Sequence, residues 1–211
     1  MKPLVVLLHG LARRHGSMAK LGAHLRAHGF ETWSQTYPSR RHSITELASA
    51  LADAIAGTAA GRPISAVTHS MGGIVARHLH DPRLAWDRIV MLAPPNRGSR
   101  LAAGLATNPM FRWAYGPAGS ELADGGAWPA PPAPFAVIAG TRARALTNPT
   151  SWTLGRRFPP GTPNDGTVAV DETRLDGMAA FAEVDATHTW IMNDARVHTL
   201  IVRYLRDGSF G

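Results

Sequence analysis

A serine lies at the centre of a short segment whose residue types could support nucleophilic catalysis. The segment Thr68-His69-Ser70-Met71-Gly72 follows an apolar run and precedes a helical pattern. A sharp turn between a strand and a helix lifts a serine hydroxyl out of the edge of a sheet, and small residues two positions away let the backbone bend tightly. Thr68 stands where the common motif has glycine. The segment predicts Ser70 as a nucleophile, with a plain helix N-cap as the alternative.

A nucleophilic serine also needs hydrogen-bond donors for the oxyanion that forms during attack. The helix after Ser70 would direct its free N-terminal N–H groups at this charge, which makes the amide of Met71 one expected donor. Gly10, at the end of the first apolar run, permits a turn that would point the Leu11 amide at the same place. Leu11 and Met71 are therefore the expected oxyanion-hole residues, and His9 is expected to be structural at this turn.

Among the ten histidines, His188 is the expected general base. It follows the last apolar run, where the carboxyl edge of a sheet would present it. An imidazole there can take the serine proton and return it to the leaving group. His69 is expected to pack beside the nucleophile. Three further histidines are expected on helix surfaces, namely His78, His80 and His198.

No metal site is predicted. His24 and His28 have the i,i+4 spacing of a helical ligand pair, but no third ligand is evident, so a solvated helix face is the expected environment. The chain has no cysteine, which excludes disulfides, thiolate chemistry and cysteine-ligated metals. The chemistry expected of Ser70 needs no cofactor, and none is predicted.

The acid that orients the base should lie between the serine and the histidine in the chain. Asp165 in TPNDGTVAV meets this condition, and Gly166 permits a tight turn there. The alternative is an ordinary Asn/Asp-Gly turn without a catalytic role. Asp185 is the least suited competitor, because it precedes His188 too closely. The other acidic candidates that stay open are Asp171, Glu172 and Asp176.

These residues must be positioned by alternating strands and helices. The helix expected over 43–57 begins with a capping box between Ser43 and Glu46 and ends at Gly57. Strands are expected over 3–10, 30–38, 63–70, 87–95, 134–140 and 179–188, and the other helices over 17–29, 71–80 and 195–208. Near-continuous apolar strands that alternate with helices predict an α/β fold. Its mostly parallel sheet of about six strands would be flanked by helices on both faces. The length fits one domain over 1–211.

Two segments interrupt this alternation. Residues 96–133 are rich in Gly, Pro and apolar side chains, and residues 141–167 form another Pro/Gly-rich stretch. Long loops in a small domain are often functional. The first segment is a candidate small cap over a substrate, although it could merely cover the sheet edge. Its expected loop-borne apolar residues are Met110, Phe111, Trp113, Tyr115 and Trp128. The same two alternatives, a cap over a substrate or a cover for the sheet edge, apply to Trp152 and Trp190.

The formal net charge is +7, and only Lys2 and Lys20 among the 22 basic residues are lysines. The arginines are scattered singly or in pairs, without a dense run, a basic helix or a dense anion-binding loop. Nucleic-acid binding is therefore not expected. The first apolar run is interrupted by His9, and no stretch approaches the roughly 20 apolar residues of a membrane span. We expect a soluble cytoplasmic protein without stable membrane insertion, unless a leader was removed.

Several segments together resemble the α/β-hydrolase fold, and most closely the compact bacterial lipases and esterases that begin at the oxyanion strand. They are LLHGL, SMAKLGAHLRAHGFETWSQTYPSR, THSMGG, LAPPNRGS and NDGTV, followed by a late histidine. The resemblance covers nearly the whole chain. It implies a catalytic triad of Ser70, Asp165 and His188 and an oxyanion hole of Leu11 and Met71. The stretch APPNRGS departs from the Gly-Thr-Pro-Asn found in many such lipases.

The expected function is hydrolysis of carboxylic esters with short to medium acyl chains through an acyl-enzyme. A small-molecule ester or lipid is thus the expected partner, and no oligomeric state is predicted. An apolar, aromatic cleft would suit acyl chains better than charged substrates. Acyl transfer, thioester cleavage and amide cleavage would use the same three residues. A non-catalytic, ligand-binding member of the fold is a further alternative.

Overall fold

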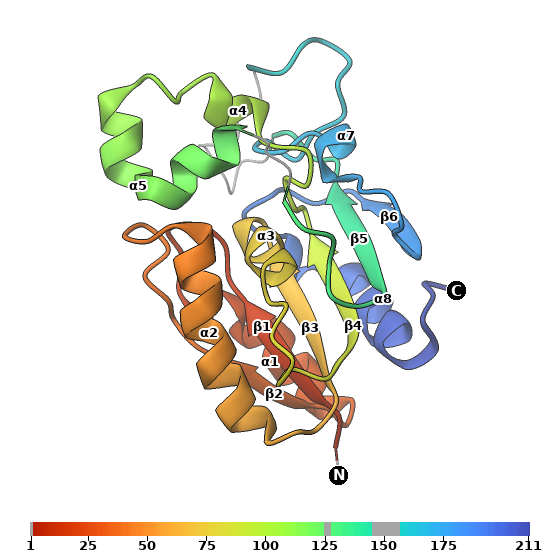
Figure 1. Cartoon of the computed structure of the whole chain (residues 1–211). Helices are drawn as coiled ribbons and strands as arrows, with labels where there is room; N and C mark the ends of the chain where they lie inside the picture. Colours follow the sequence, from red (N-terminus) through yellow and green to blue (C-terminus); the bar gives the residue numbers. More distant parts are fainter. Residues whose placement is uncertain (1, 125–127, 145–156) are drawn as a thin grey trace.

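Six parallel strands form one sheet within residues 2–124, 128–144 and 157–211, the part of the chain that the computed structural model describes. The strand order is β2-β1-β3-β4-β5-β6 (Figure 1). The strands are β1 (Leu4–Leu8), β2 (Glu31–Ser34), β3 (Ile64–His69), β4 (Trp86–Leu92), β5 (Phe135–Gly140) and β6 (Ala180–Val184). Five strands lie inside the predicted runs and β4 begins one residue earlier, so the predicted parallel sheet is confirmed.

Helices connect and cover these strands. No helix in the described ranges is both long and apolar enough to cross a bilayer. The α-helices are α1 (Ala19–Ala27), α2 (Ile44–Ala59), α3 (Met71–Arg77), α4 (Arg100–Ala103), α5 (Pro109–Asp124), α7 (Val170–Thr173) and α8 (Ala195–Asp207). Two short 3-10 helices are η1 (His15–Met18) and η3 (Ile191–Asn193).

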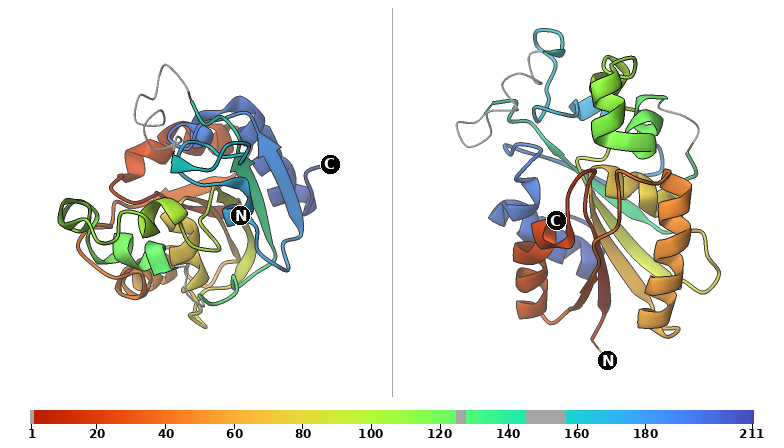
Figure 2. Two further views of the ribbon diagram at one scale, coloured as in Figure 1. Left: turned by 90° about the horizontal axis from the view of Figure 1, so that it is seen from above. Right: turned by 90° about the vertical axis from the view of Figure 1, so that its left-hand side faces the viewer.

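The sheet is the middle of three layers (Figure 2). Helices α2 and α3 cover one face, and α1 and α8 cover the other. Strand β1 contributes to both cores, because successive side chains of a strand point to opposite faces. Its residues Leu4, Val6 and Leu8 pack on the α2 side, whereas Val5 and Leu7 pack on the α8 side. Burial on both faces explains why the run is apolar throughout.

Helix α2 begins as predicted but ends later. The hydroxyl of Ser43 accepts a hydrogen bond from the Glu46 amide at 3.2 Å, and the Glu46 carboxylate accepts from the Ser43 amide at 2.8 Å. The predicted end at Gly57 is wrong, because Ala59 is buried in the core beside α3 and the helix continues to it. Ala60 then ends the helix in the left-handed conformation, with φ of 50°.

The segment between β4 and β5 contains two helices, α4 and α5, which lie beyond the carboxyl ends of the central strands (Figure 1). The expectation of loop-borne apolar side chains is wrong for the four that lie on α5. Gly116, with φ of 65°, bends this helix just before Pro117, and this Gly-Pro pair is what made the sequence resemble a loop. The four residues on α5 are Met110, Phe111, Trp113 and Tyr115.

The other aromatic residues considered as parts of a substrate cap are not on α5. Trp128 follows α5 and is half-buried against the core, and the Arg77 guanidinium donates to its carbonyl oxygen at 2.7 Å. Trp190 lies after β6 and lines a different hollow, together with Asp185. Trp152 is outside the described residues.

Candidate active site

Ser70 occupies the single position between β3 and α3. Its φ of 53° and ψ of −125° are unusual for a residue with a side chain, so the turn stores conformational strain. Two main-chain hydrogen bonds hold it, from the Ser70 amide to the Leu92 carbonyl at 2.8 Å and from the Gly73 amide to the Ser70 carbonyl at 2.9 Å. The Ser70 side chain makes no capping bond to α3, so the N-cap alternative is not supported.

Two glycines let the elements around this turn approach closely. A Cβ atom on Gly72 would lie 2.7 Å from the Leu8 carbonyl oxygen and 2.8 Å from that of His9. A Cβ on Gly10 would lie 2.9 Å from His69 Nδ1 and 3.2 Å from the Ser70 Cβ. Only glycine therefore lets the end of β1 pack against the turn, which brings the loop that carries Leu11 beside Ser70.

The structure brings Ser70, His188 and Asp165 into one hydrogen-bonded line, although they come from three separate segments. His188 Nε2 lies 3.0 Å from Ser70 Oγ, and His188 Nδ1 lies 2.7 Å from Asp165 Oδ2. Asp165 and His188 are buried, with exposed fractions of 1% and 7%, whereas Ser70 is half-buried beside a cavity. The order of the three groups is the one that proton transfer from a serine hydroxyl requires.

The surroundings of Asp165 determine which nitrogen of His188 carries the proton. Asp165 Oδ1 accepts hydrogen bonds from the amides of Thr167 at 3.0 Å and Val168 at 2.8 Å. Oδ1 thus serves as a hydrogen-bond acceptor for its own turn. An ionised carboxylate only accepts, so Nδ1 of His188 donates to it and Nε2 is left to accept from Ser70. The His188 amide also donates to the Asp165 carbonyl at 2.9 Å, which joins the two loops.

The four other acidic candidates are engaged away from His188. Glu172 is buried and accepts from the amides of Ala169 at 2.7 Å and Arg100 at 2.6 Å. Burial raises the pKa of this carboxyl group. The other three carboxylates are exposed and form ion pairs: Asp171 with Arg100, Asp176 with Arg97, and Asp185 with Arg142.

The two expected oxyanion donors have free amide groups near the serine. Within the described part of the chain, neither the Leu11 amide nor the Met71 amide donates a hydrogen bond. Met71 is the first residue of α3, where an N–H has no acceptor in its own helix. Leu11 lines the same cavity as Ser70 and His188. Leu11 therefore lies at this cavity, whereas Met71 is buried next to Ser70 in the chain and does not itself line the cavity.

His9 is fully buried and is not among the residues that line the cavity beside Ser70. Its ring stacks on Tyr37 with a centroid distance of 3.8 Å. Nδ1 lies 2.8 Å from the Gly10 carbonyl and donates to it, and Nε2 accepts from the Tyr37 amide at 3.2 Å. Burial lowers the pKa of His9, so the ring is neutral. His9 thus has a structural place at the turn, in line with expectation.

His69 has a contact that the sequence did not indicate. It packs beside His188 at a ring-centroid distance of 4.8 Å, and its Nε2 donates to the His188 carbonyl oxygen at 3.0 Å. Burial, together with the neighbouring His188, lowers the pKa of His69 well below its usual value. The neutral ring therefore holds the main chain of His188 in place. No local pattern could reveal this bond, because it joins two segments far apart in the chain.

The surface assignment of the other histidines was wrong for His198. It is buried on α8, and its Nε2 lies 2.8 Å from the Met192 carbonyl oxygen. His24 stacks on His28 at 4.1 Å and lies 4.8 Å from His198. Among the described residues, no group of three or more histidine or acidic side chains is arranged to hold a metal ion.

An apolar cavity of about 280 Å³ opens beside Ser70 and His188. Its volume lies just below the range of about 300–1,000 Å³ that is typical of small-molecule sites. The sheet edge supplies its polar end. The segment between β4 and β5, residues 96–133, is called the insertion below and supplies most of the apolar wall. The apolar side chains from α4, α5 and the turn between them are Leu101, Ala102, Leu105, Phe111, Tyr115 and Leu122.

This arrangement of a parallel sheet with a strained serine at the end of a central strand matches a known family. The model of the alpha/beta hydrolase family matches residues 5–208. The chain belongs to the alpha/beta hydrolase family. The resemblance drawn from the sequence motifs is therefore confirmed. No curated protein matches the chain.

Solved hydrolases share the fold at low sequence identity. The mature lipase BlEst2 of Bacillus licheniformis has a TM-score of 0.73 and 19% identity, over 90% of this chain and 86% of the lipase. Phospholipase PlaB of Legionella pneumophila has a TM-score of 0.71 and 17% identity, over 99% and 60% of the two chains. The metagenomic carboxyl esterase MGS0156 has a TM-score of 0.68 and 19% identity, over 88% and 64%. This hydrolase thus spans less than two thirds of the last two proteins.

Proposed function

We propose that this alpha/beta hydrolase cleaves carboxylic esters, with Ser70 as nucleophile, His188 as general base and Asp165 as the acid that orients the base. The observation that carries the proposal is the hydrogen-bonded line from Ser70 through His188 to Asp165, with contacts of 3.0 and 2.7 Å. Its position at an apolar cavity supports a substrate with an acyl chain. The structural neighbours, a lipase, a phospholipase and a carboxyl esterase, are consistent with it.

The first half of the proposed reaction forms an acyl-enzyme. Ser70 Oγ attacks the ester carbonyl carbon while His188 Nε2 takes the hydroxyl proton. The carbonyl oxygen becomes an oxyanion, which accepts hydrogen bonds from the amides of Leu11 and Met71. The bond to the alcohol then breaks, and His188 gives its proton to the departing alkoxide oxygen. Asp165 keeps its negative charge and stabilises the transient imidazolium.

The second half of the proposed reaction releases the acid. A water molecule loses a proton to His188 Nε2 and attacks the carbonyl carbon of the acyl group on Ser70. The same two amides stabilise the second oxyanion. When this intermediate collapses, the bond to Ser70 Oγ breaks, His188 returns the proton to the serine, and the carboxylic acid leaves. No metal or cofactor takes part.

The cavity limits the substrate that this site would accept. Its walls are apolar, and its volume of about 280 Å³ suits a short or medium acyl chain rather than a long one. The insertion, residues 96–133, contributes most of that wall, so we propose that it acts as a cap over the acyl group. The alcohol side of the ester would lie toward the opening of the cavity.

The test is hydrolysis of p-nitrophenyl esters with two to sixteen acyl carbons. We expect activity to be highest for short or medium chains, and Ser70→Ala to lower kcat by a factor on the order of 10⁶. Ser209→Ala, at an exposed serine near the C-terminus, is the matched control and should retain full activity. A fluorophosphonate probe should label the wild-type chain on Ser70 alone. Folded protein that hydrolyses no ester and takes no label would refute the proposal.

A further inference from the structure

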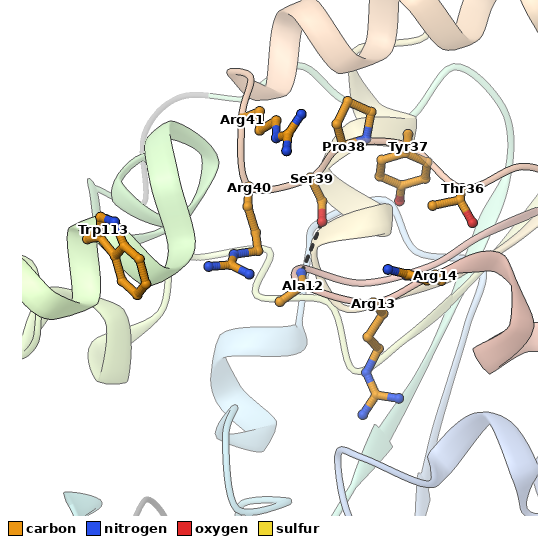
Figure 3. Close-up of a pocket in the computed structure, with 10 residues that line it drawn as sticks. All are labelled: Ala12, Arg13, Arg14, Thr36, Tyr37, Pro38, Ser39, Arg40, Arg41 and Trp113. Atoms are coloured by element: carbon orange, nitrogen blue, oxygen red, sulfur yellow. Dashed lines mark hydrogen bonds between the residues drawn. The ribbon is translucent and has the colours of Figure 1, made fainter.

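A second cavity, of about 520 Å³, shares the lining residue Arg13 with the cavity beside Ser70. Figure 3 shows the residues that line this second cavity. Its walls come from the loop after β1 and the loop after β2, with Trp113 of α5 at one side. Each loop contributes one pair of adjacent arginines, Arg13 with Arg14 and Arg40 with Arg41. The two pairs are far apart in the sequence and line one cavity only in the folded chain, with their guanidinium groups spread around it (Figure 3).

The charge of these four arginines is not neutralised. Within the described part of the chain, none of them forms an ion pair with a carboxylate, and the Arg40 guanidinium donates only to the Ala114 carbonyl. Arginines elsewhere on the surface do have carboxylate partners, for example Arg62 with Glu31, Arg83 with Asp81, Arg142 with Asp185, and Arg196 with Asp194. The cavity therefore presents unused guanidinium donors and excess positive charge to a ligand.

The loops around the cavity are held in a fixed arrangement. The Ala12 amide donates to the hydroxyl of Ser39 at 3.0 Å, which joins the two loops directly (Figure 3). Ser39 is buried, and Ala12 adopts a left-handed conformation with φ of 57°. The Tyr37 hydroxyl adds a bond to the His9 carbonyl below them. A pre-formed main-chain frame reduces the entropic cost of bringing the arginines around a ligand.

Arg13 connects this cavity with the reaction site, because it lines both. It is half-buried, and burial lowers its pKa, yet a guanidinium remains charged at neutral pH. A partly desolvated charge without a counter-ion is unfavourable, and an anion bound beside it would relieve this cost. An ester bound at Ser70 would therefore lie in a cavity that Arg13 also lines.

We propose that Arg13, Arg14, Arg40 and Arg41 form a subsite that binds a phosphate group on the alcohol side of the ester substrate. A phosphate group offers three oxygens and close to two negative charges, which suits several guanidinium groups at once. A carboxylate offers two oxygens, which a single guanidinium can satisfy. This inference rests on the proposed ester hydrolysis and departs from the expectation of an uncharged substrate.

The decisive comparison uses two soluble esters that differ only in the phosphate. They are 1-butanoylglycerol 3-phosphate and 1-butanoylglycerol, and the readout is the ratio of their kcat/KM values. We expect the wild-type ratio to exceed tenfold in favour of the phosphate ester, and Arg13→Gln, Arg14→Gln and Arg41→Gln each to lower it roughly tenfold. Arg203→Gln on α8, far from both cavities, should leave the ratio unchanged. A wild-type ratio near one would overturn the subsite and leave the ester hydrolase standing.

A binding experiment covers the case in which neither ester is cleaved. The Ser70→Ala variant is titrated calorimetrically with sn-glycerol 3-phosphate and with inorganic phosphate. Binding that weakens about tenfold in a Ser70→Ala/Arg41→Gln variant would support the anion site, and only the ester chemistry would then be wrong. Stronger binding of glycerol phosphate than of inorganic phosphate identifies a phosphoester as the ligand. Absence of binding to both would overturn the subsite.

Sedimentation with vesicles distinguishes a substrate subsite from adsorption to a lipid surface. Trp113, 80% exposed beside the arginines, could contact a membrane in that second case. Binding to phosphatidylglycerol vesicles but not to phosphatidylcholine vesicles, combined with no binding of glycerol phosphate, would overturn the proposal. Binding of glycerol phosphate, lost in the arginine variants, would support it.

Discussion

The sheet-borne part of the site and the insertion above it are held in different ways. The turn and loops that carry the three aligned side chains are fixed by main-chain hydrogen bonds, such as those of Ser70 to Leu92 and of His188 to Asp165. The insertion buries Leu122 in the core but exposes Met110 by 75% and Trp113 by 80%. The proposed chemistry thus rests on an edge of the sheet that main-chain hydrogen bonds hold, called the rigid edge below, and the shape of the cavity rests on a more exposed element.

After the loss expected for Ser70→Ala, the largest expected effect is on the rigid edge, at Asp165. Asp165→Asn keeps the size of the side chain but removes its charge, and an amide can no longer fix the proton on His188 Nδ1. We expect kcat to fall by about 10⁴ with little change in fold, because the wrong tautomer of the base would prevail. Steady-state hydrolysis of the preferred p-nitrophenyl ester, with circular dichroism as a check of folding, measures this loss.

Asp171→Asn is the matched control for that experiment. Asp171 is an exposed carboxylate in the same part of the chain, and it pairs with Arg100 rather than with His188. Removal of this exposed ion pair should change the free energy of unfolding by at most about 1 kcal/mol. Because Asp171 does not pair with His188, kcat should stay within about twofold of the wild-type value. Full activity in Asp165→Asn together with inactivity in Asp171→Asn would reverse the assignment of the acid.

The next effect concerns the close packing under the serine turn. Gly72→Ala would place a methyl group 2.7 Å from the Leu8 carbonyl oxygen, so the end of β1 must move away from the turn. We expect the free energy of unfolding to drop by about 1–3 kcal/mol, as for other overpacked sites. Activity should also fall at least tenfold, because Leu11 would move with β1. Urea denaturation and ester hydrolysis measure the two losses.

Gly57→Ala tests whether the effect comes from packing and not from loss of glycine as such. Gly57 lies inside α2, and a Cβ there would have no neighbour within 4 Å. Alanine at this position should raise the free energy of unfolding by about 0.5–1 kcal/mol, because it favours the helix. If Gly72→Ala were as harmless as Gly57→Ala, the close approach of β1 to the serine turn would not be what positions the loop that carries Leu11.

Much of the sheet and of the rigid edge could be predicted, because their signals are local. Apolar runs identified the strands, and the small residues around Ser70 indicated the turn. His188 and Asp165 could be selected because parallel strands end at the same edge, although the choice among five acids needed the loop geometry. That Asp165 meets His188 depends on bonds within its own turn, such as the Val168 amide to Oδ1.

The parts that escaped prediction depend on contacts between distant segments. Helix α5 was taken for a loop because residues 96–133 are rich in Gly and Pro, yet Gly116 and Pro117 only bend the helix where it passes the Arg40 carbonyl. The hydrogen bond from His69 to the His188 carbonyl joins the ends of two strand segments. Likewise, two arginine pairs that look isolated in the sequence share one cavity only after β1 and β2 have paired.

The smallest expected effect is on the insertion, at Glu121. Its carboxylate accepts the amide of Ile44 at 2.9 Å and so ties α5 to the first turn of α2. Glu121→Ala should lower the free energy of unfolding by only about 1 kcal/mol, the usual net contribution of a single hydrogen bond. The ratio of activities toward butanoate and octanoate esters should change by a few fold, as α5 shifts over the cavity, while labelling of Ser70 stays intact. Glu121→Gln, which keeps an acceptor oxygen, should restore both values. A fall in kcat as large as that expected for Asp165→Asn would mean that the insertion, too, holds the reacting groups, and the contrast between the two regions would fail.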